Sequence, residues 1–240
     1  MKSQIASMKQ AKDYVIGLPE QLDDFLDEAY RKALDQLLQT FDQFFNVVAS
    51  LNIRAAENQP VSSSEATRIG DHGFVLLLRL IDLMERLDLP HKRKEVEQLS
   101  VIFARWIIRY GGTINHPEPV VNAFAQLANL LQDKRSLTDL SELMEQVIDA
   151  CSTQIKQDLD KSDALRPWRL LHINRGIVAT RTHDLDIMKR AFDEMLAYLP
   201  DEATGFFSKG MKEMETQDYP QHVRHLMASY FSKKPPISLH

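Results

Sequence analysis

The 240-residue chain is long enough to bury a substantial hydrophobic core, in one large domain or in two smaller ones. Its 29 Lys and Arg residues against 34 Asp and Glu residues give a formal net charge of −5. This balance is too acidic for a protein whose whole surface wraps a phosphate backbone, so nucleic acid is not expected as a partner, although a local basic patch remains open. The prolines lie between apolar runs, as in long helices joined by short connections. We therefore expect an all-α fold, an antiparallel helical array or bundle.

The cysteine count and the apolar runs bear on the compartment. No segment approaches the roughly 20 apolar residues that cross a bilayer, and the first residues lack the apolar core of a secretory signal. Cys151 is the only cysteine, which excludes an intrachain disulfide and a multi-cysteine metal site. These features predict a cytoplasmic protein without a membrane span. Cys151 follows Met144 and Ile148 at helical spacing, so we expect a small core residue rather than a nucleophile.

The first third of the chain predicts long helices. Apolar residues recur every three or four positions from Gln21 to about Ile53, which predicts one amphipathic helix or two joined by a kink. Its apolar stripe could pack against this chain or against a second copy, so a homodimer stays open. The segment ENQPVSSSEATRIGDHG is predicted to be a hinge or loop whose glycines form a turn, and Ser62 and Glu65 within it have the spacing of a capping box. The next segment, FVLLLRLIDLMERL, is apolar on nearly every side, which indicates a helix buried between neighbours.

Three further helices are predicted in the middle of the chain. One follows Pro90 and ends at Gly111-Gly112, where a left-handed C-cap is favourable. The next starts at Pro117, and the third runs from Ser136 to about Ile155. The polar segment QDLDKSDAL then predicts a loop. Because the connections are short, successive helices should pack antiparallel.

The last third predicts four shorter helices, around residues 167–181, 184–199, 201–216 and 220–231. They suggest two helical pairs stacked onto a larger bundle. The predicted organisation is a long N-terminal amphipathic segment over residues 1–60, a central bundle over residues 61–160 and helix hairpins over residues 161–240, within one continuous helical domain.

Gly176 and Gly210 lie 34 residues apart, each in the first helix of a predicted pair. Phe206 precedes Gly210 by four positions. In the first unit, an aromatic residue, Phe192, lies in the second helix and Pro200 follows that helix. In the second unit, with one residue inserted near Pro220, Met227 and Pro235 take the corresponding two positions. This pattern resembles the tetratricopeptide repeat over about residues 167–235. The resemblance implies a right-handed stack of helix hairpins that offers a groove to a partner peptide.

The pattern departs from that repeat at several places, and two unrelated helix glycines would give the same spacing. The departures are His172, Ala179, Met188, Glu213 and Val223. If the repeat holds, both glycines should lie where the two helices of a hairpin approach closely, with Phe206 filling the adjacent gap.

Motifs for catalysis are missing from the sequence. There is no glycine-rich phosphate loop, Gly-x-Ser-x-Gly elbow, His-Glu-x-x-His motif or EF-hand loop, so we expect no catalytic residue, no cofactor and no metal ligand. His222 and His225 form a His-x-x-His pair, but a third ligand is not evident.

A second histidine pattern supports an alternative. His183-Asp184, with His116 or His172 upstream, resembles the His…His-Asp…Asp set of the all-helical metal-dependent phosphohydrolases, in which His183 and Asp184 would be ligands. Asp184 immediately precedes an apolar-periodic run, however, and is better explained as a helix N-cap.

Polar and basic residues in the segment after Pro167 point to binding. Asn174 falls on the apolar side of its predicted helix, and in helical repeats such an amide often faces the groove and holds a peptide backbone or carboxylate. Arg105 and Arg109, which lie one helical turn apart beside Trp106, could extend this group of basic residues. The predicted partner-binding residues are Arg169, His172, Asn174, Arg175, Arg105 and Arg109.

Together these features predict a scaffold or adaptor that binds another protein or peptide in a helical groove. The alternatives are a metal-dependent hydrolase with histidine and aspartate ligands, and a homodimeric helical regulatory domain.

Overall fold

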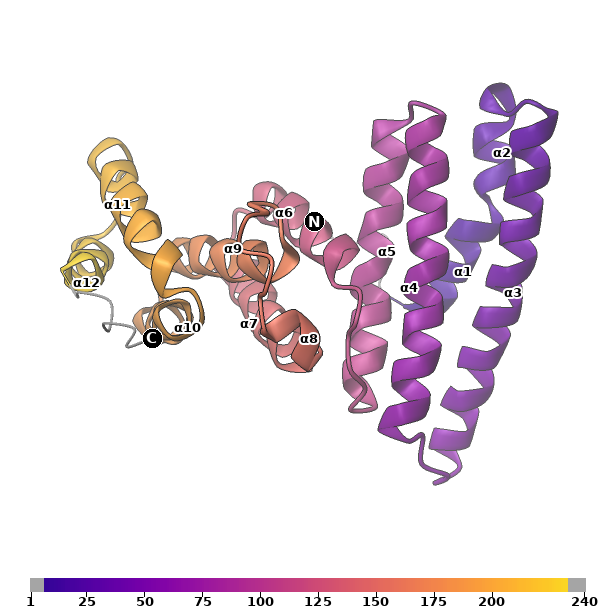
Figure 1. The fold of residues 1–240 in the computed structure, drawn as a ribbon, viewed down its shortest axis with the longest axis horizontal. Coiled ribbons are helices and arrows are strands. Elements are labelled where there is room, and N and C mark those ends of the chain that lie inside the picture. Colours follow the sequence, from indigo (N-terminus) through magenta and orange to yellow (C-terminus); the bar gives the residue numbers. More distant parts are fainter. Residues whose placement is uncertain (1–6, 233–240) are drawn as a thin grey trace. The chain divides into compact units, whose positions relative to one another are not determined.

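The computed structural model describes residues 7–232, which form twelve α-helices and one 3₁₀ helix and contain no strand. The predicted all-α class and the antiparallel packing of neighbouring helices are confirmed over these residues (Figure 1). Pro235, which was assigned a place in the repeat pattern, lies outside them. None of the helices within residues 7–232 combines the length and the apolar character that crossing a bilayer requires.

The described residues divide into two compact units. The first unit runs to Gln126 and also includes Asp149–Gln157, and the second comprises Leu127–Ile148 and the residues from Asp158 onward.

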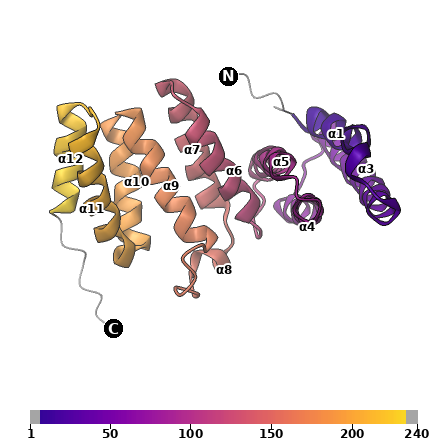
Figure 2. The ribbon, with the colours of Figure 1, turned by 90° about the horizontal axis from the view of Figure 1, so that it is seen from above.

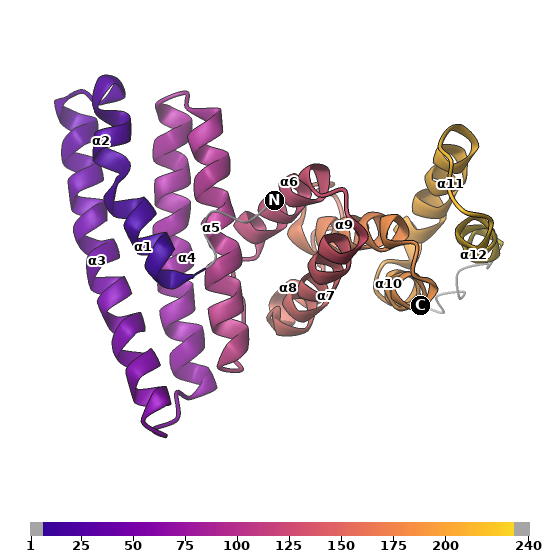
Figure 3. The same cartoon turned by 180° about the vertical axis from the view of Figure 1, so that it is seen from behind.

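Three long helices form the body of the first unit. In Figure 1, α3, α4 and α5 lie side by side, and α1 packs against both α3 and α5 (Figure 3). The bounds are α1 (Met8–Ile16), α2 (Leu18–Leu22), η1 (Asp23–Phe25), α3 (Glu28–Ala56), α4 (Ser63–Arg86), α5 (Pro90–Arg109) and α8 (Thr153–Lys156). Helix α6 (Glu118–Leu130) begins in this unit and ends in the second.

Helix α4 is the central helix of the first unit, as its nearly continuous apolar run predicts. It packs against both α3 and α5 and buries Phe74, Leu77 and Leu80. The capping box is present, because the Ser62 side chain accepts from the Glu65 backbone N–H and the Glu65 carboxylate accepts from the Ser62 N–H.

The glycines of the sequence RIGDHG do not form a turn, so that prediction is wrong. Gly70 and Gly73 lie inside α4. A Cβ atom at Gly70 would overlap Ile107 Cδ1, and one at Gly73 would lie 2.7 Å from Phe44 Cζ. The glycines allow α4 to approach α3 and α5 closely, and this packing offsets their low helix propensity.

The helix predicted to run from Ser136 to Ile155 is also shorter than expected. Helix α7 ends at Ala150, and Cys151 forms an isolated parallel bridge with Ile114. Cys151 is buried, as predicted, and burial raises the pKa of its thiol to about 12. Its thiol is therefore protonated and unreactive at neutral pH.

The second unit contains two helix hairpins, α9 with α10 and α11 with α12, packed through α10 against both helices of the second pair (Figure 2). The bounds are α7 (Lys134–Ala150), α9 (Pro167–Thr182), α10 (Leu185–Tyr198), α11 (Pro200–Thr216) and α12 (Gln221–Phe231). The four C-terminal helices thus start and end within two residues of the predicted positions. The rings of Phe192, Phe207 and Tyr230 meet in the core between the hairpins.

Gly176 and Gly210 lie at close contacts within their own hairpins, as predicted, with Met195 of α10 beside Gly176 and Met227 of α12 beside Gly210. Phe206 of α11 also reaches Gly176, from the other hairpin. A Cβ atom at Gly176 would lie 2.7 Å from Phe206 Cζ, so Phe206 fills the gap beside Gly176. A Cβ atom at Gly210 would lie 2.8 Å from Met227 Cε. The two glycines therefore allow side chains of neighbouring helices to reach the backbones of α9 and α11.

Candidate functional site

The second unit contains a groove with a volume of about 640 Å³, lined mainly by α9 and α11, which we call the α9–α11 groove. Helix α11 contributes one face, at spacings of three and four residues, from Glu202 to Gln217. At 1.5 Å per residue this face is about 22 Å long. Asn129, Tyr219 and Met227 complete the lining. The groove is therefore elongated, with a length that matches a linear segment of chain.

Apolar side chains line the middle of the groove. They come from three helices: Ile173 and Ile177 from α9, Phe206 and Met214 from α11, and Met227 from α12. Ile177 is 45% exposed, which is unusual for a large aliphatic side chain on a helix that also buries Leu171 and Val178. The methionines have flexible, polarizable side chains that adapt to different apolar surfaces.

An ion pair closes one end of the groove. Arg169 Nε lies 2.8 Å from Glu202 Oε1, and Arg169 Nη1 donates to the Ala164 carbonyl at 2.9 Å. The hydrogen bond and the charge of Arg169 lower the pKa of the Glu202 carboxyl. The two opposite charges therefore largely cancel each other at this end.

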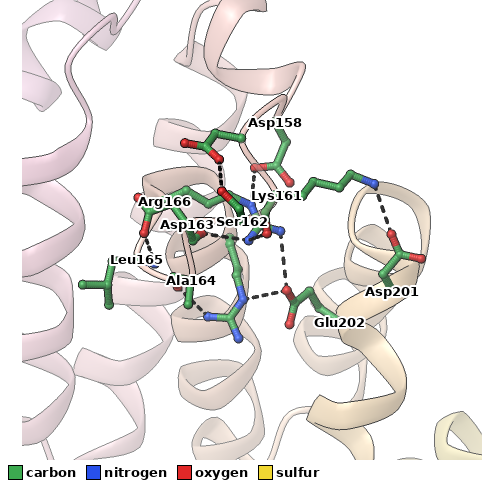
Figure 4. Close-up of polar contacts among 11 residues, drawn as sticks. Asp158, Lys161, Ser162, Asp163, Ala164, Leu165, Arg166, Asp201 and Glu202 are labelled. Atoms are coloured by element: carbon green, nitrogen blue, oxygen red, sulfur yellow. Dashed lines mark hydrogen bonds and ion pairs between the residues drawn. The ribbon is translucent and has the colours of Figure 1, made fainter.

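Beside this ion pair, Arg166 fixes the loop between α8 and α9 (Figure 4). Arg166 Nε donates to Asp158 Oδ1 at 2.7 Å, and Arg166 Nη1 donates to the Asp163 carbonyl at 3.0 Å. Arg166 Nη2 also lies 3.4 Å from Glu202 Oε1, so one carboxylate joins the loop, α9 and α11. This network makes the Arg169 end of the groove rigid.

The rest of the groove carries charges without such partners. Arg181 donates to the backbone carbonyls of Ala128 and Leu131, the latter at 2.7 Å, at the C-terminal end of α6. These acceptors are neutral, and no carboxylate within residues 7–232 forms an ion pair with Arg181. Lys209 is exposed and forms no ion pair or hydrogen bond among residues 7–232, whereas Glu213 accepts from Gln217 Nε2 at 2.8 Å.

The structure places the predicted binding residues in four environments. Arg169 lines the groove. Asn174 is half-buried and does not belong to the groove lining, whereas His172 and Arg175 are each 1% exposed. Arg105 and Arg109 are exposed on α5 in the first unit, where the Arg109 guanidinium lies over the Tyr110 ring. The groove therefore contains one of the six predicted residues.

His172 and Arg175 do not reach the groove because their side chains are buried against other residues. Arg175 forms ion pairs with Glu194 of α10 and, at 2.9 Å, with Glu145 of α7. His172 packs edge-on against Trp168, with 4.5 Å between ring centroids. Burial, with a smaller effect of the nearby Arg175 charge, lowers the pKa of His172 to about 3. His172 is therefore neutral at physiological pH.

The structure gives the candidate metal ligands of the hydrolase alternative roles at helix ends. Asp184 is the N-cap of α10, where its side chain accepts from the backbone N–H groups of Asp186 and Ile187, as the cap interpretation predicts. His183 ends α9 in the left-handed conformation, and His222 Nε2 lies 3.2 Å from its carbonyl oxygen. His172 and His183 are about 16 Å apart along the α9 axis, too far to share a metal ion. Among residues 7–232, no three His, Cys, Asp or Glu side chains are grouped so that they could hold a metal ion.

No protein-family model matches the chain, and comparisons with curated proteins and with solved structures found no match.

Proposed function

We propose that the chain is an interaction scaffold that binds a linear segment of another protein, through apolar side chains, in the α9–α11 groove. The observation that carries the proposal is the groove itself: about 640 Å³, elongated, and lined by apolar side chains together with charged ones. Apolar pockets give affinity through burial, and polar groups around them fix orientation.

The shape of the groove supports a linear ligand rather than a compact one. Its α11 face extends over about 22 Å, which equals the length of a helix of about 15 residues. A compact small molecule would occupy only part of this length. The resemblance to the tetratricopeptide repeat supports the same proposal, because it implies a stack of helix hairpins that offers a groove to a partner peptide.

The first test uses Gly205, which lines the groove inside α11. A Cβ atom at this position would meet nothing within 4 Å, so the groove is open there. Gly205→Trp should fill the groove, and Gly205→Ala is the matched control that leaves it open. A library of displayed 16-residue peptides is selected against the full chain, and the affinity of each enriched peptide is measured by fluorescence anisotropy. We expect Gly205→Trp to weaken binding at least tenfold, a loss of about 1.4 kcal/mol, and Gly205→Ala to retain it.

Three outcomes would overturn the proposal. One is that enriched peptides bind Gly205→Trp as tightly as the unaltered chain, while circular dichroism shows that both are equally folded. Another is that repeated selections enrich no peptide. Loss of binding to both Gly205 variants would also contradict it, because alanine leaves the groove open.

A further inference from the structure

We propose that the segment bound in the α9–α11 groove is an amphipathic α-helix whose apolar face is flanked by acidic residues. This inference rests on the proposed function and specifies its ligand. Two properties of the groove carry it: what its lining offers to a peptide backbone, and which of its charges lack an opposite charge.

The lining favours a helical ligand over an extended one. An extended peptide needs hydrogen-bond partners for its own N–H and C=O groups, which a sheet edge or a row of polar side chains supplies. Residues 7–232 contain no strand, and the groove presents the apolar side chains of Ile173, Ile177 and Phe206. A helix satisfies its backbone internally and can bury an apolar stripe against these side chains.

The charges favour an acidic ligand. Arg169 and Glu202 largely cancel as an ion pair at 2.8 Å. Arg181 is held by neutral carbonyl oxygens, and Lys209 has no partner among the described residues. Glu213 is the one opposing charge in the lining that is not paired with a cation, so two positive charges face one negative charge. Carboxylates beside the apolar face of the ligand would approach Lys209 and Arg181, whereas a basic ligand would be repelled there.

The position of the charges also predicts an orientation. Lys209 lies about halfway along the α11 face of the groove, and Arg181 belongs to the last turn of α9, away from the Arg169–Glu202 pair at the other end. Acidic groups of the bound helix should therefore lie between its middle and the end near Arg181, and not beside the Arg169–Glu202 pair.

The test compares three synthetic peptides of 16 residues that share the same leucine stripe and a fluorescein label. One has glutamate beside the stripe, one has lysine there, and the third is the glutamate peptide with two central prolines that prevent a helix. Affinities for the full chain are measured by fluorescence anisotropy at low and at moderate salt. We expect the glutamate peptide to bind about tenfold more tightly than the lysine peptide at low salt, a preference that shrinks as salt rises. The proline peptide should bind at least tenfold more weakly.

A matched pair of charge reversals locates the effect. Lys209→Glu reverses a groove charge, and Lys212→Glu reverses an exposed charge on the same helix outside the groove lining. Each new glutamate lies one helical turn from an existing glutamate of α11, Glu213 for position 209 and Glu215 for position 212. The like-charge repulsion should therefore destabilise the helix to a similar extent in both variants. Lys209→Glu should weaken the glutamate peptide about tenfold, and Lys212→Glu should change its affinity by less than twofold.

The outcomes separate this inference from the proposed function. Equal or tighter binding of the lysine peptide, undiminished binding of the proline peptide, or equal effects of the two reversals would overturn the inference. If peptides still lose binding to Gly205→Trp in that case, the groove remains a binding site and only the ligand assignment fails. If Gly205→Trp changes nothing, the proposed function fails as well.

Discussion

His172 is a neutral imidazole in the core of the second unit, so its protonation is linked to folding. In the unfolded chain it binds a proton near pH 6.5, whereas burial lowers its pKa in the folded protein to about 3. Between these values the unfolded state binds more protons, so the stability contributed by the neutral ring is present above pH 6.5 and decreases as the pH falls toward 3.

A single substitution tests this linkage. At 1.36 kcal/mol for each pH unit, acidification from pH 6.5 to pH 5 should cost about 2 kcal/mol through His172. His172→Phe keeps an aromatic ring beside Trp168 but cannot titrate, so its unfolding free energy should fall less over this range. Urea unfolding at a series of pH values measures the difference. His225→Phe, at an exposed position, is the control; equal pH dependence of His172→Phe and the unaltered chain would contradict the linkage.

At the scale of helix packing, replacing glycine with alanine should have opposite effects on stability at two positions, Gly176 and Gly205. At Gly176 an added methyl group would meet the Phe206 ring at 2.7 Å, so Gly176→Ala should destabilise by about 1–2 kcal/mol despite its better helix propensity. At Gly205 nothing lies within 4 Å, so Gly205→Ala should stabilise by about 0.5–1 kcal/mol. Thermal unfolding of the two variants measures the shifts. Stabilisation by Gly176→Ala would show that the contact with Phe206 does not restrict this position.

The elements that sequence predicts best are those with local signals. Pro167 and Pro200 stand at the first position of α9 and α11, and Asp184 caps α10, so these helices start where predicted. The glycines of α4 carry no local sign of close packing. They are explained only by Ile107 and Phe44, which approach from other helices.

The groove could be predicted only in part, for a similar reason. A polar residue on the apolar side of α9 suggests either a ligand contact or a buried partner, and periodicity cannot distinguish them. Arg175 is buried because Glu145, thirty positions earlier in the chain, lies beside it. Lys209 was missed because its place in the groove depends on how α11 packs beside α9. The spacing of Phe206, Lys209 and Glu213 on one helix face was the only available signal.

For the whole molecule, the two units predict which segments unfold together. Core amides exchange with solvent through opening of the unit that contains them. Gly176→Ala should therefore accelerate hydrogen exchange in α9 and α10, and also in α7, which belongs largely to the same unit. Helices α3–α5 should keep their exchange rates. Hydrogen exchange with mass spectrometry measures this, and uniform acceleration through both units would show that they open as one.

The division of the chain into two units also limits which fragments of the protein can keep the groove intact. An end-to-end fusion of two domains passes from one to the other once, whereas this chain passes three times, after Gln126, after Ile148 and after Gln157. A fragment that starts at Asp158 would contain the whole groove face of α11 but would leave Arg175 buried without Glu145. It would also remove the Ala128 and Leu131 carbonyls that hold Arg181. A faithful minimal binding fragment must therefore begin near Leu127 and replace Asp149–Gln157 with a linker, because no single cut separates the two units.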